Sequence, residues 1–265
     1  MPTGRPPPSP TPTCGEACFS PGLGARLRPR APAVKVVIMA GGRGTRLAPY
    51  TTVLPKPLMP LGDRPIVDVL LRQLVAAGAE EVSISVGHLG GVIESWIRAE
   101  RYEVPVSFLY ESEPLGTAGA LRNAKVGETF VAMNGDVLTT LALSDLLARH
   151  RESGAVATVA VTERTTQVEY GVVHTDGAGA VARLEEKPRL RYTVSMGVYA
   201  FEPRVVELIA PGERVDFPDL LERAMAQGET VAVHPFDGYW RDIGNPEDYA
   251  QAVADFAADP GRFIG

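Results

Sequence analysis

A short apolar run that ends in glycines limits the folds open to this chain more than any other feature of its sequence. Val34–Met39 has the length and the β-branched content of a buried strand, and Gly41, Gly42 and Gly44 follow at once. A glycine turn after a parallel strand lies at the carboxyl edge of an α/β sheet, where such folds bind ligands. Its backbone N–H groups can approach a phosphate closely. The run therefore predicts an α/β sheet with an anion site at one edge, although a plain strand-to-loop turn also fits these glycines.

Segments with strand and helix patterns alternate through the first half of the chain, which is typical of βαβ units and a largely parallel sheet. A helix is expected to begin behind Asp63 as its N-cap and to end before Gly78. The other expected helices are 92–98 and 117–123, and the expected strands are 34–39, 81–86, 106–109 and 130–133.

The second half is richer in strands. Strands are expected at 156–161, 171–174, 181–186 and 194–201, with a turn at Asp176-Gly177, and helices at 203–209, 217–227 and 246–256. The predicted fold class is α/β: a Rossmann-like, mostly parallel mixed sheet flanked by helices. A small antiparallel insertion is expected to form one wall of a substrate cleft.

The first 33 residues differ in composition from the rest of the chain. They contain nine prolines, and both cysteines of the chain, Cys14 and Cys18, lie among them. Such a segment supports no helix and buries little, so we expect 1–33 to be a disordered tail and 34–265 to be the catalytic domain. The two thiols are interpreted as unpaired, because a metal site would need further ligands.

Composition and hydropathy narrow the class of protein. The net charge of −6 argues against a nucleic-acid binder. No run of 18 or more apolar residues or signal-peptide core is present, so we expect no membrane association. The domain at 34–265 has no cysteine, and a cytoplasmic location is therefore expected.

Two basic residues beside the glycine turn suit phosphate binding. Lys56 stands between Pro55 and Pro57, which restrict the local backbone and hold the lysine in place at low entropic cost. A fixed lysine acts as a point charge on phosphate, and Arg46 can contact phosphate through two N–H groups. A solvated lysine on a rigid loop is the plainer alternative for Lys56 alone.

An aspartate follows the strand expected at 130–133. Asn134-Gly135-Asp136 places a carboxylate just past a strand end, at the same sheet edge as the glycine turn. Mg²⁺ prefers carboxylate and phosphate oxygens, so Asp136 is a candidate metal ligand. An aspartate that only forms a turn is an equally good interpretation of this segment in isolation.

Taken together, five ordered motifs make the chain resemble the sugar-phosphate nucleotidylyltransferases. They are Ala40-Gly-Gly-Arg-Gly-Thr-Arg-Leu47, Pro55-Lys-Pro-Leu58, Asn134-Gly-Asp136, Glu186-Lys-Pro188 and Trp240-Arg-Asp-Ile-Gly-Asn-Pro246. Within this family, Glu113-Pro-Leu-Gly-Thr-Ala-Gly119 and Gly238-Tyr-Trp-Arg-Asp-Ile-Gly244 are most similar to the short mannose-1-phosphate guanylyltransferases. Related heptose-phosphate and pseudosugar-phosphate enzymes share much of this pattern.

The resemblance implies a role for each matching position. Catalysis falls to Arg46, Lys56 and Asp136, and Mg²⁺ to Asp136 and Asp242. The nucleotide would be bound by Ala40, Gly41, Gly42, Arg43, Gly44, Thr45, Glu111 and Gly116. The sugar phosphate would be bound in the insertion and beside it by Gly135, Gly171, Glu186, Lys187, Ser195 and Gly197.

The resemblance also implies the reaction. A nucleoside triphosphate, with GTP favoured, and a sugar-1-phosphate, such as mannose-1-phosphate or a related heptose or pseudosugar phosphate, would react by in-line attack on the α-phosphate. Alternatives are a uridylyl- or thymidylyltransferase on another hexose-1-phosphate and a non-catalytic regulatory subunit that binds nucleotide sugars. A glycosyltransferase is disfavoured because Asn134-Gly135-Asp136 is not an Asp-x-Asp pair. Assembly into a homo-oligomer is left open.

Overall fold

The computed structural model describes Met1, Gly4 and residues 34–264. The proline-rich tail predicted at 1–33 therefore lies almost wholly outside the described residues, and its disorder stays a prediction. Residues 34–264 belong to one compact unit.

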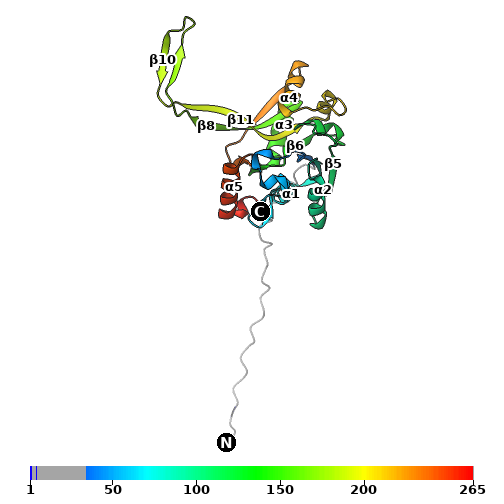
Figure 1. The fold of residues 1–265 in the computed structure, drawn as a ribbon. Coiled ribbons are helices and arrows are strands. Elements are labelled where there is room, and N and C mark those ends of the chain that lie inside the picture. The colour runs from blue at the N-terminus through cyan, green and yellow to red at the C-terminus, as the bar shows by residue number, and fades with distance from the viewer. Residues whose placement is uncertain (2–3, 5–33, 265) are drawn as a thin grey trace. The chain divides into compact units, whose positions relative to one another are not determined.

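The centre of this unit is a seven-stranded mixed sheet, which confirms the predicted fold class (Figure 1). Its strand order is β12-β8-β11-β6-β1-β4-β5, with bounds Val231–Pro235, Ala157–Gln167, Arg189–Phe201, Phe130–Asn134, Val34–Met39, Ala79–Val86 and Val106–Tyr110. Strand β1 pairs in parallel with β4 and β6, and β4 pairs in parallel with β5. Strand β11 runs antiparallel between β6 and β8.

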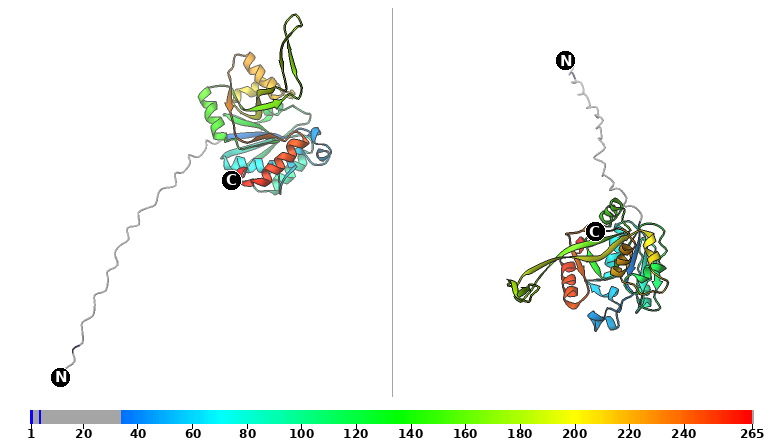
Figure 2. Two further views of the ribbon diagram at one scale, coloured as in Figure 1. Left: turned by 90° about the vertical axis from the view of Figure 1, so that its left-hand side faces the viewer. Right: turned by 90° about the horizontal axis from the view of Figure 1, so that it is seen from above.

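Helices cover both faces of this sheet (Figure 2). They are α1 (Ile66–Ala76), α2 (Gly90–Ala99), α3 (Leu143–Ser153), α4 (Phe217–Ala226) and α5 (Pro246–Ala258). On β1, Val36 and Ile38 belong to one core cluster and Val37 to the other. Because successive side chains of a strand point to opposite faces, a strand buried on both sides must be apolar throughout. This explains why β1 is apolar except at Lys35, which is partly exposed and pairs with Glu81.

Several local expectations were wrong. Helix α1 begins after Pro65 rather than behind Asp63, because Arg64–Pro65 (β3) pairs with Pro60–Leu61 (β2). The helices expected at 117–123 and 203–209 are 3₁₀ segments, Gly119–Asn123 (η4) and Pro203–Leu208 (η5). Helix α3 and strand β12 had not been predicted at all.

The predicted antiparallel insertion is present and extends from the sheet (Figure 1). Strands β8 and β11 continue as a ladder past the sheet, and β9 (Val172–Thr175) and β10 (Val181–Glu185) form a hairpin beyond them. The turn expected at Asp176-Gly177 is confirmed, since the Asp176 carboxylate accepts hydrogen bonds from two backbone N–H groups of the turn. We call residues 162–195 the arm.

The described helices are short or polar: none in residues 34–264 combines the length and the apolar character needed to cross a bilayer.

Candidate active site

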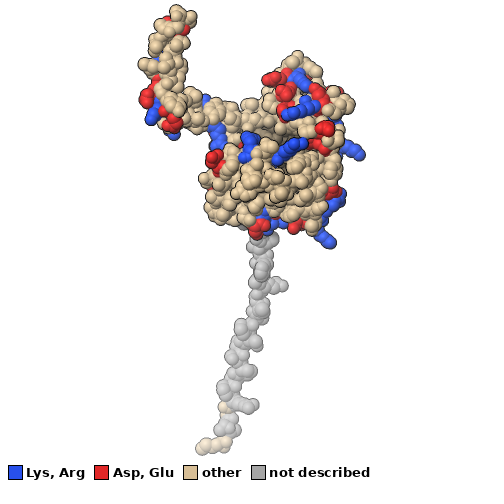
Figure 3. All heavy atoms as spheres, in the orientation of Figure 1, with Lys and Arg blue, Asp and Glu red and all other residues tan. Residues whose placement is uncertain are grey.

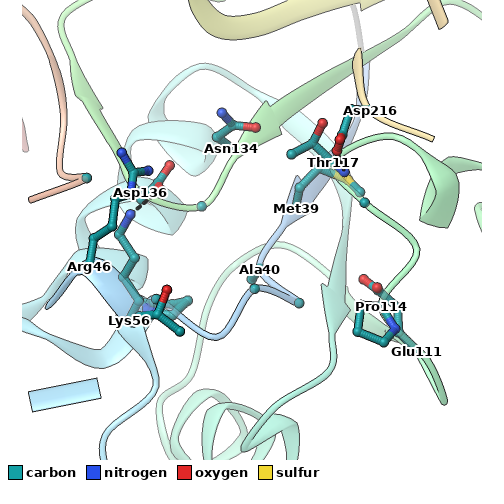
Figure 4. A pocket seen from close by; sticks show the side chains of 18 of the residues that line it. Met39, Ala40, Arg46, Lys56, Glu111, Pro114, Thr117, Asn134, Asp136 and Asp216 are labelled. Atoms are coloured by element: carbon teal, nitrogen blue, oxygen red, sulfur yellow. Dashed lines mark hydrogen bonds and ion pairs between the residues drawn. The ribbon is translucent and has the colours of Figure 1, made fainter. Parts of the chain in front are cut away.

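A pocket of about 430 Å³ opens where β1 and β6 end, at the carboxyl edge of the parallel strands (Figure 4). Its walls come from the glycine turn after β1, the loop after β6, the segment after β5, the loop before α4 and the end of β13 (Trp240–Asp242). Of the residues proposed from sequence, it is lined by Ala40, Gly41, Gly42, Gly44, Thr45, Arg46, Lys56, Glu111, Gly116, Gly135, Asp136 and Asp242. The structure thus gathers most of them around one cavity.

The glycine turn has a shape that requires glycine at two positions. Gly44 has φ +62°, and a Cβ there would lie 3.0 Å from the Thr51 side chain and 3.2 Å from Lys56 Cβ. A Cβ on Gly41 would lie 2.3 Å from a carboxylate oxygen of Glu111. Such close approach is available only without a side chain. The turn therefore brings Lys56 and Glu111 against the backbone that follows β1.

Lys56 and Asp136 form an ion pair in the pocket (Figure 4). Lys56 begins a 3₁₀ turn, Lys56–Leu58 (η3), and its Nζ donates to Asp136 Oδ2. The second carboxylate oxygen, Asp136 Oδ1, is buried and has no hydrogen-bond partner among the described residues. A buried carboxylate oxygen without a donor is costly, so this atom is suited to hold a cation.

Asp242 lies beside Asp136 because two short strands pair. Strand β13 runs antiparallel to β7 (Val137–Thr139), with Asp242 opposite Val137, and Ile243 N donates to Asp136 O at 2.9 Å. Burial, together with the negative charge of Asp136, raises the pKa of the Asp242 carboxyl. The negative charge of Asp136 therefore makes the charged form of Asp242 less favourable while no cation lies between the two side chains.

This end of the pocket fits Mg²⁺. Mg²⁺ commonly binds one or two carboxylates and completes its shell with water and phosphate oxygens. Asp136 supplies an unpartnered oxygen and Asp242 a second carboxylate with a raised pKa. A Cβ on Gly244 would lie 3.1 Å from Asp242 Oδ2 and 3.3 Å from the Arg46 guanidinium, so a positively charged side chain borders the same position.

The opposite end of the pocket is held by a network of backbone hydrogen bonds. The Glu111 carboxylate accepts from the Ser85 hydroxyl and, at 2.9 Å, from Leu115 N. Leu115 O accepts from Val215 N at 2.9 Å, and Val215 O accepts from Ala118 N at the same distance. Glu111, Gly116 and the segment before α4 therefore form one rigid wall.

The segment before α4 brings residues to the pocket that the sequence analysis missed. Arg214 and Asp216 line it, together with Thr117. Asp216 Oδ1 accepts from Thr117 N at 2.7 Å, and Thr117 Oγ1 accepts from Phe217 N. The capping box of Asp216 and Asp219 could have predicted where α4 begins. It could not have predicted that this helix start lies beside Thr117.

Asn134, the last residue of β6, also lines the pocket, although it was not among the residues proposed from sequence.

The sugar-phosphate residues proposed from the resemblance are divided between two places. Gly135 lines the pocket, where its N–H donates to Met39 O at 2.9 Å. Gly197 lies at the base of the arm with φ +70°, and a Cβ there would lie 2.5 Å from the Asn134 amide nitrogen. Ser195 bonds the Tyr199 hydroxyl at 2.9 Å.

The other three sugar-phosphate candidates lie further out on the arm than Ser195, and no arm residue lines the pocket. A Cβ on Gly171 would lie 3.2 Å from Glu186 Oε2, so these two residues are neighbours. Lys187 follows with φ +45°, a conformation that is uncommon outside glycine. Arg43, proposed for nucleotide binding, is also outside the pocket lining.

Comparison with known proteins places these residues in a family. The family model described as nucleotidyl transferase matches residues 35–259. The UTP–glucose-1-phosphate uridylyltransferase of Synechocystis sp. is 34% identical over 243 residues, and the mannose-1-phosphate guanyltransferase of Yarrowia lipolytica is 34% identical over 230. The matches cover 83% and 82% of this chain, and 62% of the length of each relative.

Solved structures also resemble the chain. HddC from Yersinia pseudotuberculosis has a TM-score of 0.67 at 27% identity, and the comparison covers 84% of this chain and 99% of HddC. HddC has also been solved in complex with GMP-PN, where the TM-score is 0.66 at 26% identity, over 84% of this chain and 99% of that one.

Proposed function

Because the chain belongs to the nucleotidyl transferase family, we propose that it transfers a nucleotidyl group from a nucleoside triphosphate to a sugar-1-phosphate and releases pyrophosphate. The observation that carries this proposal is the grouping of Arg46, Lys56, Asp136 and Asp242 at one end of a single pocket. Glu111 lies at the other end, where it can meet a nucleobase. Anionic phosphates and a base with hydrogen-bond donors would both find partners there.

The chemistry requires positioning and charge rather than a general base. A phosphate oxygen of the sugar-1-phosphate attacks the α-phosphorus, the bond from that phosphorus to the bridging β-phosphate oxygen breaks, and pyrophosphate leaves in line. The nucleophile is already an anion. Lys56 and Arg46 would neutralise charge as the two polyanions approach, and the glycine-turn N–H groups would hold the triphosphate. Mg²⁺ held by Asp136 and Asp242 would supply further positive charge at these phosphates.

GTP is the nucleotide that the base end of the pocket favours. The Watson–Crick edge of guanine presents two adjacent donors, N1–H and the N2 amino group, whereas uracil and thymine present only N3–H. The Glu111 carboxylate is fixed by Ser85 and Leu115 and still has free lone pairs to accept from both guanine donors. The guanyltransferase relative and the GMP-PN complex of HddC support this choice.

Two further assignments complete the proposal. Gly135 in the pocket, with Ser195 and Gly197 beside the base of the arm, would bind the sugar phosphate, with mannose-1-phosphate or a related heptose or pseudosugar phosphate as the acceptor. Gly171, Glu186 and Lys187 lie away from the pocket and would bind it only with the arm turned toward the pocket. We place the reaction in the cytoplasm. A uridylyltransferase is the second candidate, because the Synechocystis relative carries that name.

One experiment tests the reaction and the base together. GTP, UTP, dTTP and ATP are each combined with mannose-1-phosphate, glucose-1-phosphate and a heptose-1-phosphate in the presence of Mg²⁺, and pyrophosphate is measured. We expect release with GTP, and none from the matched Asp136→Asn variant. Preference for UTP or dTTP would overturn the guanylyl assignment. Absence of pyrophosphate in every combination would overturn the proposed reaction.

A further inference from the structure

The glycine turn after β1 presents backbone N–H groups to the pocket. No backbone carbonyl in residues 34–264 accepts a hydrogen bond from the N–H of Gly42, Gly44 or Thr45, and all three residues line the pocket. Successive backbone N–H groups in such a turn can form a binding place for an anion. Whether an N–H group takes part depends on the direction in which it points, and at Thr45 a residue outside the pocket fixes that direction.

These N–H groups matter because the surface of the protein is not basic overall. In the face drawn in Figure 3, Lys and Arg side chains are interspersed with Asp and Glu, and the chain carries a net charge of −6. A polyphosphate therefore meets no broad basic patch on this face, and its binding depends on a few well-placed donors in the pocket. Arg46 and Lys56 are two of these donors, and the N–H groups of the glycine turn add to them.

Thr51 packs against the glycine turn without lining the pocket. Its side chain is 3% exposed, and its Oγ1 donates to Gly44 O at 2.8 Å. Leu47 N donates to the same carbonyl oxygen at 2.9 Å. The Thr51 methyl group also fits the turn closely, since a Cβ on Gly44 would lie 3.0 Å from Thr51 Cγ2. Two donors therefore keep the Gly44 carbonyl directed into the protein.

The direction of this carbonyl also sets the direction of the next N–H group. The Gly44–Thr45 peptide is trans, and in a planar trans peptide the C=O and the N–H point to opposite sides. Because Gly44 O is directed toward Thr51 and Leu47 N, the N–H of Thr45 points to the other side, where Thr45 lines the pocket. Gly44 has φ +62° and no Cβ, so this peptide would rotate readily if the Thr51 hydroxyl were removed.

The same contacts lie where the segments that carry the two cations meet. Arg46 is the middle residue of the 3₁₀ turn Thr45–Leu47 (η1), which begins directly after Gly44. A Cβ on Gly44 would lie 3.2 Å from Lys56 Cβ, so Lys56 and Thr51 border the same glycine. The hydroxyl of Thr51 is therefore well placed to align the Thr45 N–H with the side chains that bind phosphate.

From these observations we propose that Thr51 is a positioning residue for the phosphates that leave as pyrophosphate. Through its hydrogen bond to Gly44 O, it directs the Thr45 N–H toward an oxygen of these phosphates. This inference rests on the proposed function, because it takes the polyphosphate of a nucleoside triphosphate as the ligand of the turn. Thr51 itself touches no substrate. Loss of its hydroxyl should weaken the binding of pyrophosphate and leave the base end of the pocket, at Glu111, unchanged.

Calorimetry with inorganic pyrophosphate and with GMP, each with Mg²⁺ and without sugar phosphate, tests the proposal. Thr51→Val keeps the branched shape of the side chain but has no hydroxyl. Its Kd for pyrophosphate should rise about tenfold, while its Kd for GMP should stay within about twofold of the wild type. Thr51→Ser retains the hydroxyl and should bind both ligands like the wild type. Thr52→Val is the matched control, because Thr52 is the next residue of the same loop and is exposed.

A thermal melt of each variant checks that the domain is folded, and Thr51→Ala replaces Thr51→Val if the latter does not fold. An unchanged Kd for pyrophosphate without the hydroxyl would overturn the proposal. Equal losses of pyrophosphate and GMP binding, or a loss in Thr51→Ser or Thr52→Val as large as in Thr51→Val, would also overturn it. A wild type that shows this dependence on Thr51 but releases no pyrophosphate with any pair of substrates would overturn the proposed function alone.

Discussion

At the scale of single residues, the neighbouring carboxylates of Asp136 and Asp242 carry charges of the same sign in one pocket. Burial and the charge of Asp136 raise the pKa of Asp242, so this carboxylate is unfavourable until a cation joins it. Asp242→Asn removes that charge. In metal-free protein we expect a higher Tm, by about 2–4 °C for each 1 kcal/mol gained. The further rise in Tm that Mg²⁺ with GTP gives the wild type should be lost, and kcat should fall roughly 10²-fold or more.

Calorimetry with and without Mg²⁺ and GTP checks this prediction. Asp255→Asn, on α5 and outside the pocket lining, is the control and should keep the stabilisation by ligand. A metal-free Tm below that of the wild type would contradict the idea that the two carboxylates repel each other.

In the metal-free protein, a substitution of Lys56 should change the Tm in the opposite direction to Asp242→Asn. Lys56 is the partner of Asp136, and its removal leaves a partly buried carboxylate without a cation. Lys56→Ala should therefore lower the metal-free Tm and also reduce kcat roughly 10²-fold or more, because a fixed positive charge at the phosphates is lost. Pyrophosphate assays and thermal melts measure the two effects, and Lys35→Ala, a partly exposed lysine of β1 outside the pocket, serves as the control. Near-normal turnover in Lys56→Ala would show that this lysine does not act on the phosphates.

Arg214 lines the pocket beside the residues proposed to meet the base, and no salt bridge to it is found in residues 34–264. An unpaired guanidinium there can bind the nucleotide without taking part in bond breaking. We expect Arg214→Ala to raise KM for GTP about tenfold, which corresponds to the loss of about 1.4 kcal/mol of binding, with little change in kcat. Arg204→Ala is the control, since Arg204 pairs with Glu229 outside the pocket. Equal kinetics for Arg214→Ala and the wild type would remove Arg214 from the binding site.

At the scale of elements, long segments with one clear pattern were predictable and short ones were not. Strand β1 and helix α4 follow directly from apolar periodicity and from the capping residues near 216. Segments η4 and η5 have only five and six residues, too few to distinguish an α-helix from a 3₁₀ helix by period. Helix α3 does have helical spacing in Leu143, Leu146, Leu147 and His150, with Gly154 in a left-handed conformation at its end. Most of the other residues of α3 are polar, so this apolar spacing was not recognised as a helix in the sequence analysis.

Helix α3 is also where the fold should respond to pH. His150 Nδ1 lies 2.8 Å from Thr158 Oγ1 of β8, and Nε2 lies 3.2 Å from Glu202 Oε1. Burial lowers the pKa of His150 below its ordinary 6.5, although Glu202 partly opposes this. As pH falls below about 6.5, the unfolded chain takes up the proton before the folded one, so stability should fall by at most about 1.4 kcal/mol per pH unit. Above that pH both states are neutral and the effect vanishes.

Urea unfolding between pH 5 and 7.5 measures this dependence. His150→Gln should be less stable at neutral pH, because its hydrogen bonds are altered, but its stability should change less between pH 6.5 and 5. His88→Gln, at an exposed position, is the control and should follow the wild type. If His150→Gln and the wild type lose stability in parallel, the acid sensitivity belongs to other groups.

At the scale of the whole molecule, the sequence predicted which residues gather around the pocket better than it predicted the direction of the arm. Asp136 and Asp242 are far apart in the chain and meet only because β7 pairs with β13, yet the family resemblance named both. Lys187, Glu186 and Gly171 were named in the same way, but the structure holds them away from the pocket. The direction in which the arm leaves the sheet depends on the contacts of Trp240 with Met196 and Arg164. These residues are far apart in the sequence, so no local pattern predicts the contacts.

The last prediction concerns the boundary of the folded domain. The two described core clusters are built from residues between Val34 and Phe263, and β1 begins at Val34. Removal of 1–33 should therefore leave the Tm within about 1 °C and kcat unchanged. A slightly longer deletion, of 1–36, is the matched control, because it takes away Val34 and Val36, which are 4% and 1% exposed. Burial of a valine side chain is worth about 1.5–3 kcal/mol, and β1 is the central parallel strand beside the pocket, so this second deletion should lower the Tm by several degrees and reduce activity. Thermal melts and pyrophosphate assays of the two truncations decide the matter: a large loss on removing 1–33 alone would place part of that segment in the folded domain.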